Sequence, residues 1–269
     1  MVSDEVKPRL YADRAAVVVH LISLIAVMTS TPEFAATTQG QILCAMEVVT
    51  IVAHAVYVCR YNDKNYTEWQ VLKWAEYAIS ATLGIFAVAY VSDADVSFNV
   101  IFLLAAAGVA QQSQGYQLEY YMNENRNGFS WSDRNIVISF VVASALQVGE
   151  FLVVSRIIDK SSNVSGTEWL VYWSYVVGYS LFGVIMAGVI RYEIAAEKAE
   201  IVYTIAGIFS KLAILFGDLA AFNESYVGAA CVLAMISLTT TLIVALSFEV
   251  VRVRAKSLVR MCTPKYLLL

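Results

Sequence analysis

Long apolar runs alternate with short polar clusters along the chain, and this pattern predicts membrane-spanning α-helices. Each run has about 20 residues, the length that carries an α-helix across a hydrocarbon core of roughly 30 Å. Backbone amides in a bilayer must be satisfied within their own segment, so helices are favoured over open strands, and no alternating barrel pattern is visible. Eight runs are predicted to span the membrane, at residues 13–34, 40–61, 68–91, 97–122, 133–156, 168–191, 197–221 and 226–251.

The composition agrees with an all-α membrane protein. Of the 269 residues 59% are hydrophobic and 15% are charged, and the mean hydropathy is +0.65, far outside the range of soluble domains. The four cysteines, at positions 44, 59, 231 and 262, show neither paired nor metal-ligand spacing and are interpreted as reduced packing residues. We therefore expect a lipid bilayer around the chain, with no metal site and no nucleic-acid partner.

Basic residues gather in every second connection, which indicates the orientation of the helices. Cytoplasmic loops carry an excess of lysine and arginine. The opposite side of the predicted bundle holds only Arg156 and Lys160, so we expect both termini to be cytoplasmic. The fifteen basic residues on the cytoplasmic side are Lys7, Arg9, Arg14, Arg60, Lys64, Lys73, Arg126, Arg134, Arg191, Lys198, Arg252, Arg254, Lys256, Arg260 and Lys265.

A lysine interrupts the seventh run, in the segment "GIFSKLAILFGD" (207–218). Helical rise places Lys211 roughly 18 Å from the start of its span, too deep for its stem to reach either surface easily. An ionisable group at this depth is a functional hypothesis by default. Three explanations are open at this point: a structural ion pair, a transport site for an anion or a proton, and a Schiff base with an aldehyde cofactor.

The predicted partner of this lysine lies in the third run, within "KWAEYAISATLG" (73–84). Glu76 and Ser80 are one helical turn apart and share a face. Helical rise puts Glu76 roughly 6 Å shallower in the membrane than Lys211. The alternative is a carboxylate near the headgroups that Lys73 neutralises.

The only two histidines extend this predicted site. His20 in the first span and His54 in the second are expected at similar depth, where they could form a polar cluster with Glu76. Glu47 lies two turns before His54 on the same face. The alternative for each histidine is ordinary hydrogen-bonded packing.

Two carboxylates and a group of aromatic side chains complete the candidates. Glu150 and Asp218 could line a proton path together with Glu47, although hydrogen bonding within the bundle would also account for them. Aromatic residues are dense in "WLVYWSYVVGYSLFG" (169–183), which includes Trp173 and Tyr179. Interfacial anchoring and bundle packing are the alternative role of these aromatics.

Several of these segments resemble one family of membrane photoreceptors. "LKWAEYAISAT" (72–82) resembles the third-helix signature of heliorhodopsins: a basic residue, Trp, one residue, Glu, Tyr and a nearby Ser. "EKAEIVYTIAGIFSKLAILFGDLAAF" (197–222) resembles their last helix, and "YSLFG" followed by "RY" (179–192) is similar to their sixth. Weaker similarity extends from about residue 9 to 222. The predicted cytoplasmic amino terminus agrees with this family and differs from ordinary microbial rhodopsins.

The resemblance implies a seven-helix rhodopsin-like bundle that binds all-trans retinal. Lys211 would form the retinal Schiff base and Glu76 would be its counterion, with Ser80 beside it. His20 and His54 would form a polar cavity on the cytoplasmic side. Further cofactor contacts are predicted at Ser210, Tyr179 and Trp173.

The chain continues beyond the seventh helix, which is where the family usually ends. The bundle is predicted over residues 1–222, an additional transmembrane helix over 223–251, and a basic cytoplasmic tail, with "RVRAKSLVR" (252–260), over 252–269. This tail could bind anionic lipid or a cytoplasmic partner. It is too short to be a catalytic domain, so no enzyme activity is expected.

The leading prediction is therefore a light sensor in which isomerisation of retinal drives a conformational signal, and a homodimer is expected. The alternative is a light-gated or light-driven conductor of protons, favoured by the carboxylates at membrane depth. A retinal-free transporter or scaffold is less favoured, because the segments around Glu76 and Lys211 match the family together.

Overall fold

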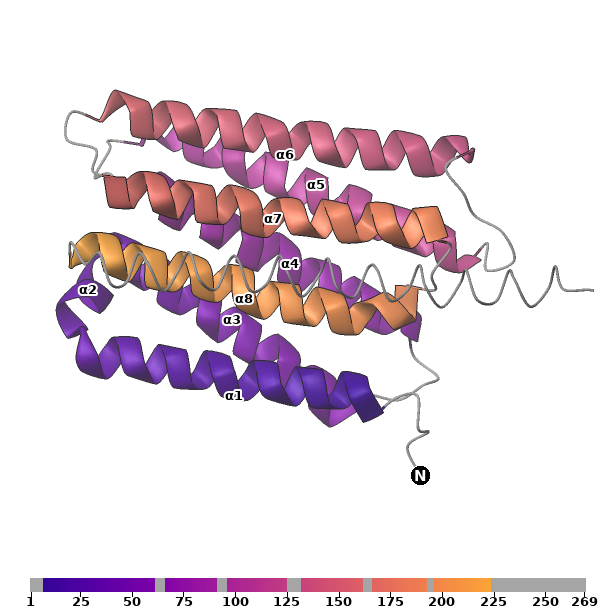
Figure 1. Cartoon of the computed structure of the whole chain (residues 1–269), viewed down its shortest axis with the longest axis horizontal. Helices are drawn as coiled ribbons and strands as arrows, with labels where there is room; N and C mark the ends of the chain where they lie inside the picture. Colours follow the sequence, from indigo (N-terminus) through magenta and orange to yellow (C-terminus); the bar gives the residue numbers. More distant parts are fainter. Residues whose placement is uncertain are drawn as a thin grey trace, which may run out of the picture.

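The computed structural model describes residues 7–60, 66–90, 96–124, 132–161, 166–192 and 196–223, and these are almost entirely helical. Within these ranges, seven long helices and one short one follow each other (Figure 1). They are α1 (Lys7–Ser30), α2 (Pro32–Ala36), α3 (Thr38–Arg60), α4 (Tyr66–Ala89), α5 (Phe98–Glu124), α6 (Arg134–Lys160), α7 (Gly166–Tyr192) and α8 (Ala196–Phe222).

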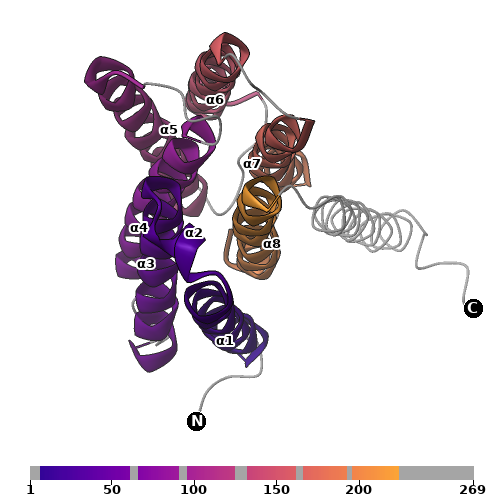
Figure 2. The same ribbon diagram turned by 90° about the vertical axis from the view of Figure 1, so that its left-hand side faces the viewer.

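Successive long helices are antiparallel and lie side by side (Figure 1). An end view shows how they surround a common interior (Figure 2). Neighbours in the chain pack against one another, and α8 returns to pack against α1. Helix α4 is the most central, because it also contacts α6, α7 and α8. Residues on the inward face of α4 can therefore meet side chains from the opposite side of the bundle.

The first connection contains the short helix α2, so the first predicted span (13–34) ends earlier than expected. Helix α1 ends at Ser30, and Pro32 opens α2, a position where its missing N–H costs nothing. Phe34 is fully buried and its ring centroid lies 5.3 Å from that of Phe222. A side chain at Gly40 would place its Cβ 2.0 Å from the Phe34 carbonyl oxygen, so this turn requires glycine.

Six of the described helices are long and apolar enough to cross a membrane: α1, α3, α4, α6, α7 and α8. The predicted span at 97–122 corresponds to α5, which has 27 residues but carries several glutamines that lower its hydropathy, at positions 111, 112, 114 and 117. The predicted eighth span (226–251) and the basic tail (252–269) lie outside the described residues, so the division of the chain after residue 222 stays a prediction.

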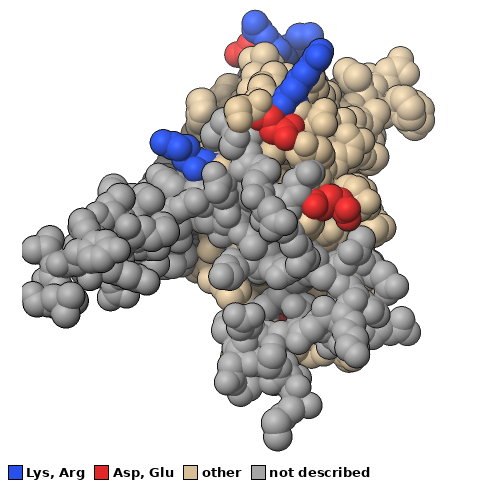
Figure 3. Space-filling model, turned by 90° about the vertical axis from the view of Figure 1, so that its right-hand side faces the viewer, with Lys and Arg blue, Asp and Glu red and all other residues tan. Residues whose placement is uncertain are grey.

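Apolar side chains fill the two halves of the bundle separately. One cluster, which includes Ile85 and Val154, lies toward the end that carries α2. Another, which includes Leu118 and Ile190, lies toward the opposite end, where α1 and α8 begin. We call these the α2 end and the N-terminal end. Figure 3 looks at the N-terminal end, where basic and acidic side chains both lie at the surface. Buried polar side chains lie between the apolar clusters, and they form the candidate site.

Candidate functional site

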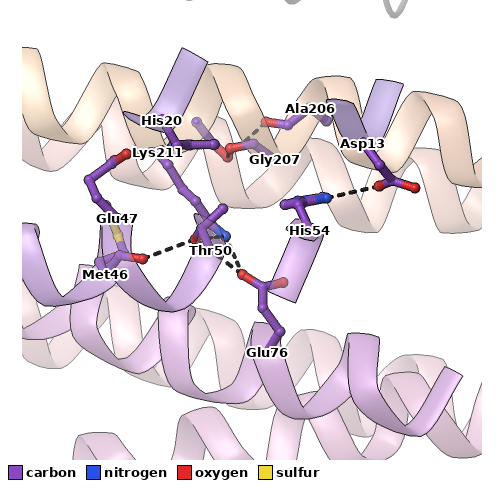
Figure 4. Close-up of polar contacts among 11 residues, drawn as sticks. Asp13, His20, Met46, Glu47, Thr50, His54, Glu76, Ala206, Gly207 and Lys211 are labelled. Atoms are coloured by element: carbon purple, nitrogen blue, oxygen red, sulfur yellow. Dashed lines mark hydrogen bonds and ion pairs between the residues drawn. The ribbon is translucent and has the colours of Figure 1, made fainter. Parts of the chain in front are cut away.

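Lys211, in the middle of α8, contacts Glu76 of α4 (Figure 4). Its Nζ donates hydrogen bonds to Glu76 Oε1 at 2.5 Å and to Thr50 Oγ1 of α3 at 2.7 Å. The Thr50 hydroxyl also lies 3.0 Å from the Met46 carbonyl oxygen and 3.3 Å from Glu76 Oε1. Three helices thus converge on one ammonium group, and Thr50 is a member of the site that the sequence did not predict.

The pair is buried, which determines what it can do. The side chains of Lys211 and Glu76 are only 7% and 2% exposed. Burying one such charge without its partner is strongly unfavourable, so each group requires the other in its ionised form. Glu76 Oε2 has no hydrogen-bond partner among the described residues, which leaves an acceptor beside the lysine.

The backbone around Lys211 approaches α7 closely. A Cβ at Gly178 of α7 would lie 2.8 Å from the Ser210 Cβ, so glycine is required for this contact. The Ser210 hydroxyl donates to the carbonyl oxygens of Ala206 and Gly207, at 2.8 and 3.2 Å. Ser210 therefore satisfies its own polar group within α8 and positions the turn that carries the lysine.

A cavity with several aromatic side chains in its wall opens beside Lys211, between α4, α5, α6, α7 and α8. The predicted contacts Ser80, Tyr179 and Ser210 all line it. Gly115 of α5 makes room for one wall, because a Cβ there would lie 2.3 Å from the Trp74 ring. The other side chains at the cavity are Lys73, Tyr77, Ala81, Gln111, Gln112, Leu118, Phe140, Ala143, Ser144, Gln147, Phe182, Gly183, Met186 and Tyr203.

Trp173 does not belong to this cavity, and the prediction that it contacts the cofactor is corrected. Its side chain is 55% exposed, on the outer face of α7. Successive residues of an α-helix are about 100° apart, so Trp173 points away from the face on which Tyr175 is fully buried. The cavity-lining aromatics of α7 are Tyr179 and Phe182.

The two histidines pair separately with carboxylates, so the expectation that they lie at similar depth is wrong. His20 Nδ1 lies 2.6 Å from Glu47 Oε2, and His54 Nδ1 lies 2.8 Å from Asp13 Oδ1. Helices α1 and α3 are antiparallel, and each carries a carboxylate seven residues before its histidine. The two pairs are therefore about 10 Å apart along the helices.

These pairs lie on both sides of the lysine. Glu47, Thr50 and His54 follow one another at helical spacing on one face of α3, so they form a file of buried polar groups (Figure 4). Thr50 meets Lys211 in the middle of this file. His54 is near enough to Glu76 for the two groups to interact electrostatically.

Lys73 does not neutralise Glu76, which excludes that alternative. Its Nζ donates to Glu119 Oε2 of α5 at 2.6 Å and to Glu200 Oε1 of α8. Lys73 is also buried, with only 3% of its surface exposed. From the sequence it was counted with the basic residues of the cytoplasmic side. The cation that neutralises Glu76 is therefore Lys211.

Two further carboxylates are buried away from this pair. Glu150 of α6 and Asp218 of α8 are 2% and 0% exposed, and neither has a hydrogen-bond partner for its carboxylate oxygens among the described residues. Neither residue lines the cavity beside Lys211. In the part of the chain that the structure describes, no three His, Cys, Asp or Glu side chains are placed to hold a metal ion.

The bundle is similar to a solved rhodopsin structure. The crystal structure of Exiguobacterium sibiricum rhodopsin aligns with a TM-score of 0.66 over 82% of this chain and 98% of that one, at 11% identity. This chain has a rhodopsin-like fold. No protein-family model and no curated protein matches the sequence.

Sequence reasoning missed Asp13, Thr50 and Glu200 as members of buried polar pairs. Thr50 could have been found, because it lies three residues after Glu47 and four before His54 on the same face. Asp13 and Glu200 lie near the ends of α1 and α8, where a charge normally indicates an interface with water. Nothing in a single sequence separates them from such interfacial charges.

Proposed function

We propose that this protein is a light sensor of the heliorhodopsin type that carries all-trans retinal on Lys211 through a Schiff base. The observation that carries the proposal is the buried contact between Lys211 and Glu76 at one side of an aromatic cavity within a rhodopsin-like bundle. The signature segments around these two residues support the same assignment. Both termini are proposed to be cytoplasmic.

The residues present fit this cofactor. Lys211 supplies the amine, and Glu76 supplies a carboxylate at 2.5 Å that balances a positive charge on that nitrogen. The cavity walls are mainly aromatic and small side chains, which suit a long apolar molecule. When bound, retinal supplies light absorption and a change of shape within the cavity.

The remaining residues hold or exchange protons near this nitrogen. Thr50 and Glu76 both accept hydrogen bonds from Lys211 Nζ and so fix the position of its protons. The pairs His20–Glu47 and His54–Asp13 can each share a proton, one pair on either side of Thr50. Transfer of a proton from Lys211 Nζ to the Glu76 carboxylate would neutralise both groups of the ion pair. This loss of a buried charge pair is the step that would turn light absorption into a conformational signal.

Absorption spectroscopy tests this function directly. Protein expressed with all-trans retinal should show a visible band, and Lys211→Ala should lack it. Lys211→Arg should lack it as well, because a guanidinium cannot condense with an aldehyde. A band that survives in Lys211→Arg would contradict attachment at this position.

A light-gated or light-driven proton conductor is the second candidate function. It is favoured by Glu150 and Asp218, which are buried and whose carboxylate oxygens lack hydrogen-bond partners among the described residues. Photocurrents under voltage clamp separate the two functions. Loss of current in Glu150→Gln or Asp218→Asn would identify a proton path. Absence of current in the wild-type protein would contradict the conductor and favour the light sensor.

A second copy of the chain is the partner we propose for the outer face of α5 and α6. This face has a groove that contains amide, hydroxyl and phenol groups, including Gln114, Gln117 and Ser139. Polar side chains directed at lipid are costly, and they commonly bond across helix interfaces. A two-fold axis would bring the same polar groups of both copies together. Cysteine cross-linking at position 117 should yield a dimer, and a monomer in nanodiscs would contradict it.

A further inference from the structure

Lys73 joins three helices at the N-terminal side of the cavity. From α4 it donates to Glu119 of α5 and to Glu200 of α8, and all three side chains are at most 4% exposed. Helices α5 and α8 are not neighbours around the bundle, because α6 and α7 separate them on one side and α4 on the other. The ammonium group is therefore a direct link between elements that otherwise have little contact.

The same group is attached to the aromatic wall of the cavity. Trp74 Nε1 donates to Glu119 Oε2 at 2.5 Å, the oxygen that also accepts from Lys73. Lys73 Nζ lies 5.1 Å from the Trp74 ring centroid and 5.8 Å from that of Tyr203. These distances are in the range of cation–π attraction.

The wall continues from these rings to the lysine of the candidate site. The Tyr203 ring stacks on Phe182 at 6.2 Å, and Phe182 meets Tyr77 edge-on at 5.9 Å. Tyr77 also meets Trp74 at 5.7 Å, and Lys211 Nζ lies 6.0 Å from the Tyr77 ring centroid. Side-chain contacts thus run without interruption from Lys211 to Lys73.

We propose that Lys73 is a positioning residue that holds the wall of Trp74, Tyr77, Phe182 and Tyr203 in place. Through Glu119 and Glu200, it transmits displacement of this wall to the last turns of α5 and the first turns of α8. The transmission part rests on the proposed light-sensing function, whereas the positioning part does not. Buried hydrogen-bonded ion clusters have discrete arrangements, so a shift of the rings can exchange one arrangement of Lys73 for another.

Variants that remove the charges together test this proposal. Removing Lys73 alone would leave two buried carboxylates, so the triple variant Lys73→Met/Glu119→Gln/Glu200→Gln is preferable. A matched control is Tyr172→Phe, which removes a buried hydrogen bond from α7 to the Phe151 carbonyl oxygen of α6, and neither residue lines the cavity. Lys73→Arg keeps a cation at the junction.

Hydrogen exchange measured by mass spectrometry on retinal-free protein supplies the first readout. In the triple variant, peptides from residues 113–124 and 196–206 should exchange about tenfold faster, since hydrogen bonds to charged groups are lost. The control should change only peptides of α6 and α7, and Lys73→Arg should stay near wild type. Unchanged exchange at 113–124 and 196–206 in the triple variant would overturn the positioning role.

Illumination of retinal-loaded protein supplies the second readout. In the wild type, light should accelerate exchange in the same two segments, and the triple variant should lose this light response while the control keeps it. A light response that persists in the triple variant would overturn the transmission role. If the triple variant does not fold, Trp74→Phe replaces it, and unchanged exchange at 113–124 in that variant would overturn the proposal. Failure of the wild type to bind retinal would contradict the proposed function, while the first readout still decides the positioning role.

Discussion

Thr50 and Lys211 are joined by a buried hydrogen bond of 2.7 Å, although they lie 161 residues apart in the chain. The threonine belongs to α3, so this bond connects the file of polar groups on α3 to the lysine of α8. The same hydroxyl lies within 3.3 Å of Glu76. Thr50 therefore positions both members of the central ion pair.

Thr50→Val should destabilise the protein while keeping its shape. Valine has nearly the same volume but cannot bond to Lys211, and a hydrogen bond to a charged group contributes about 1.5–3 kcal/mol. Thermal denaturation in detergent measures this loss. Thr82→Val is the control, because Thr82 donates only to the Ala78 carbonyl of its own helix. Equal losses in both variants would show that Thr50 has no special relationship to Lys211.

Glu76→Gln should change the visible spectrum of the retinal-loaded protein. Removing the carboxylate destabilises a positive charge on Lys211 Nζ, so the band should shift to longer wavelength or the nitrogen should lose its proton. Absorption spectra over a pH series distinguish these results. An unchanged band would assign the counterion role to another carboxylate, and Asp218→Asn would then be the variant to measure.

The two histidine pairs should behave as independent units. A double-mutant cycle of Asp13→Asn with His54→Gln, and another of Glu47→Gln with His20→Gln, should each give a coupling energy of about 0.5–3 kcal/mol. The crossed cycle of Asp13→Asn with Glu47→Gln should give a coupling near zero, since these residues belong to different pairs. Equal coupling in the crossed cycle would indicate one joint cluster.

Gly115→Ala should disturb the cavity, because the added Cβ would lie 2.3 Å from the Trp74 ring. Overpacking of this kind costs about 1–3 kcal/mol, and the ring must move. Thermal stability and the yield of retinal-loaded protein measure the two effects. Gly149→Ala on α6 is the matched control, with no atom within 4 Å of the added group. If Gly115→Ala changes neither thermal stability nor the yield of retinal-loaded protein, the Trp74 ring is not held tightly against α5.

Trp173→Phe should leave the absorption band unchanged, whereas Tyr179→Leu should shift it. Trp173 is exposed on the outer face of α7, while Tyr179 lines the cavity. Absorption spectra of the two variants after equal loading with retinal make the comparison. A shift with Trp173→Phe comparable to that with Tyr179→Leu would contradict the arrangement of α7.

Much of the fold was predictable from the sequence, because apolar runs of membrane length leave few alternatives to a helical bundle. The contact between Lys211 and Glu76 was also suggested, since a buried ammonium requires a partner. Estimates of membrane depth were wrong where side chains reach across helices. Helical rise placed Glu76 shallower in the membrane than Lys211, yet Lys211 Nζ lies 2.5 Å from Glu76 Oε1. Helical rise gives the depth of each backbone position, but long side chains such as lysine and glutamate can span the difference in depth between two backbones.

The histidines and Lys73 show what a single sequence leaves open. Matching His20 with His54 assumed equal depth, but the antiparallel order of α1 and α3 pairs each histidine with a carboxylate of the other helix. Lys73 was counted with the basic residues of the cytoplasmic side, because charges near the ends of runs are usually exposed. Its burial depends on Glu119 and Glu200, and only the packing of α5 and α8 brings these together.

Chemical trapping of the bound retinal determines whether it is attached to Lys211. Protein loaded with all-trans retinal is reduced with borohydride, digested and examined by mass spectrometry for a retinyl group. We expect the modification on the peptide that contains Lys211 and on no other lysine, and Lys73, which lines the same cavity, is the internal comparison. Modification of Lys73, or of no lysine, would contradict attachment at Lys211.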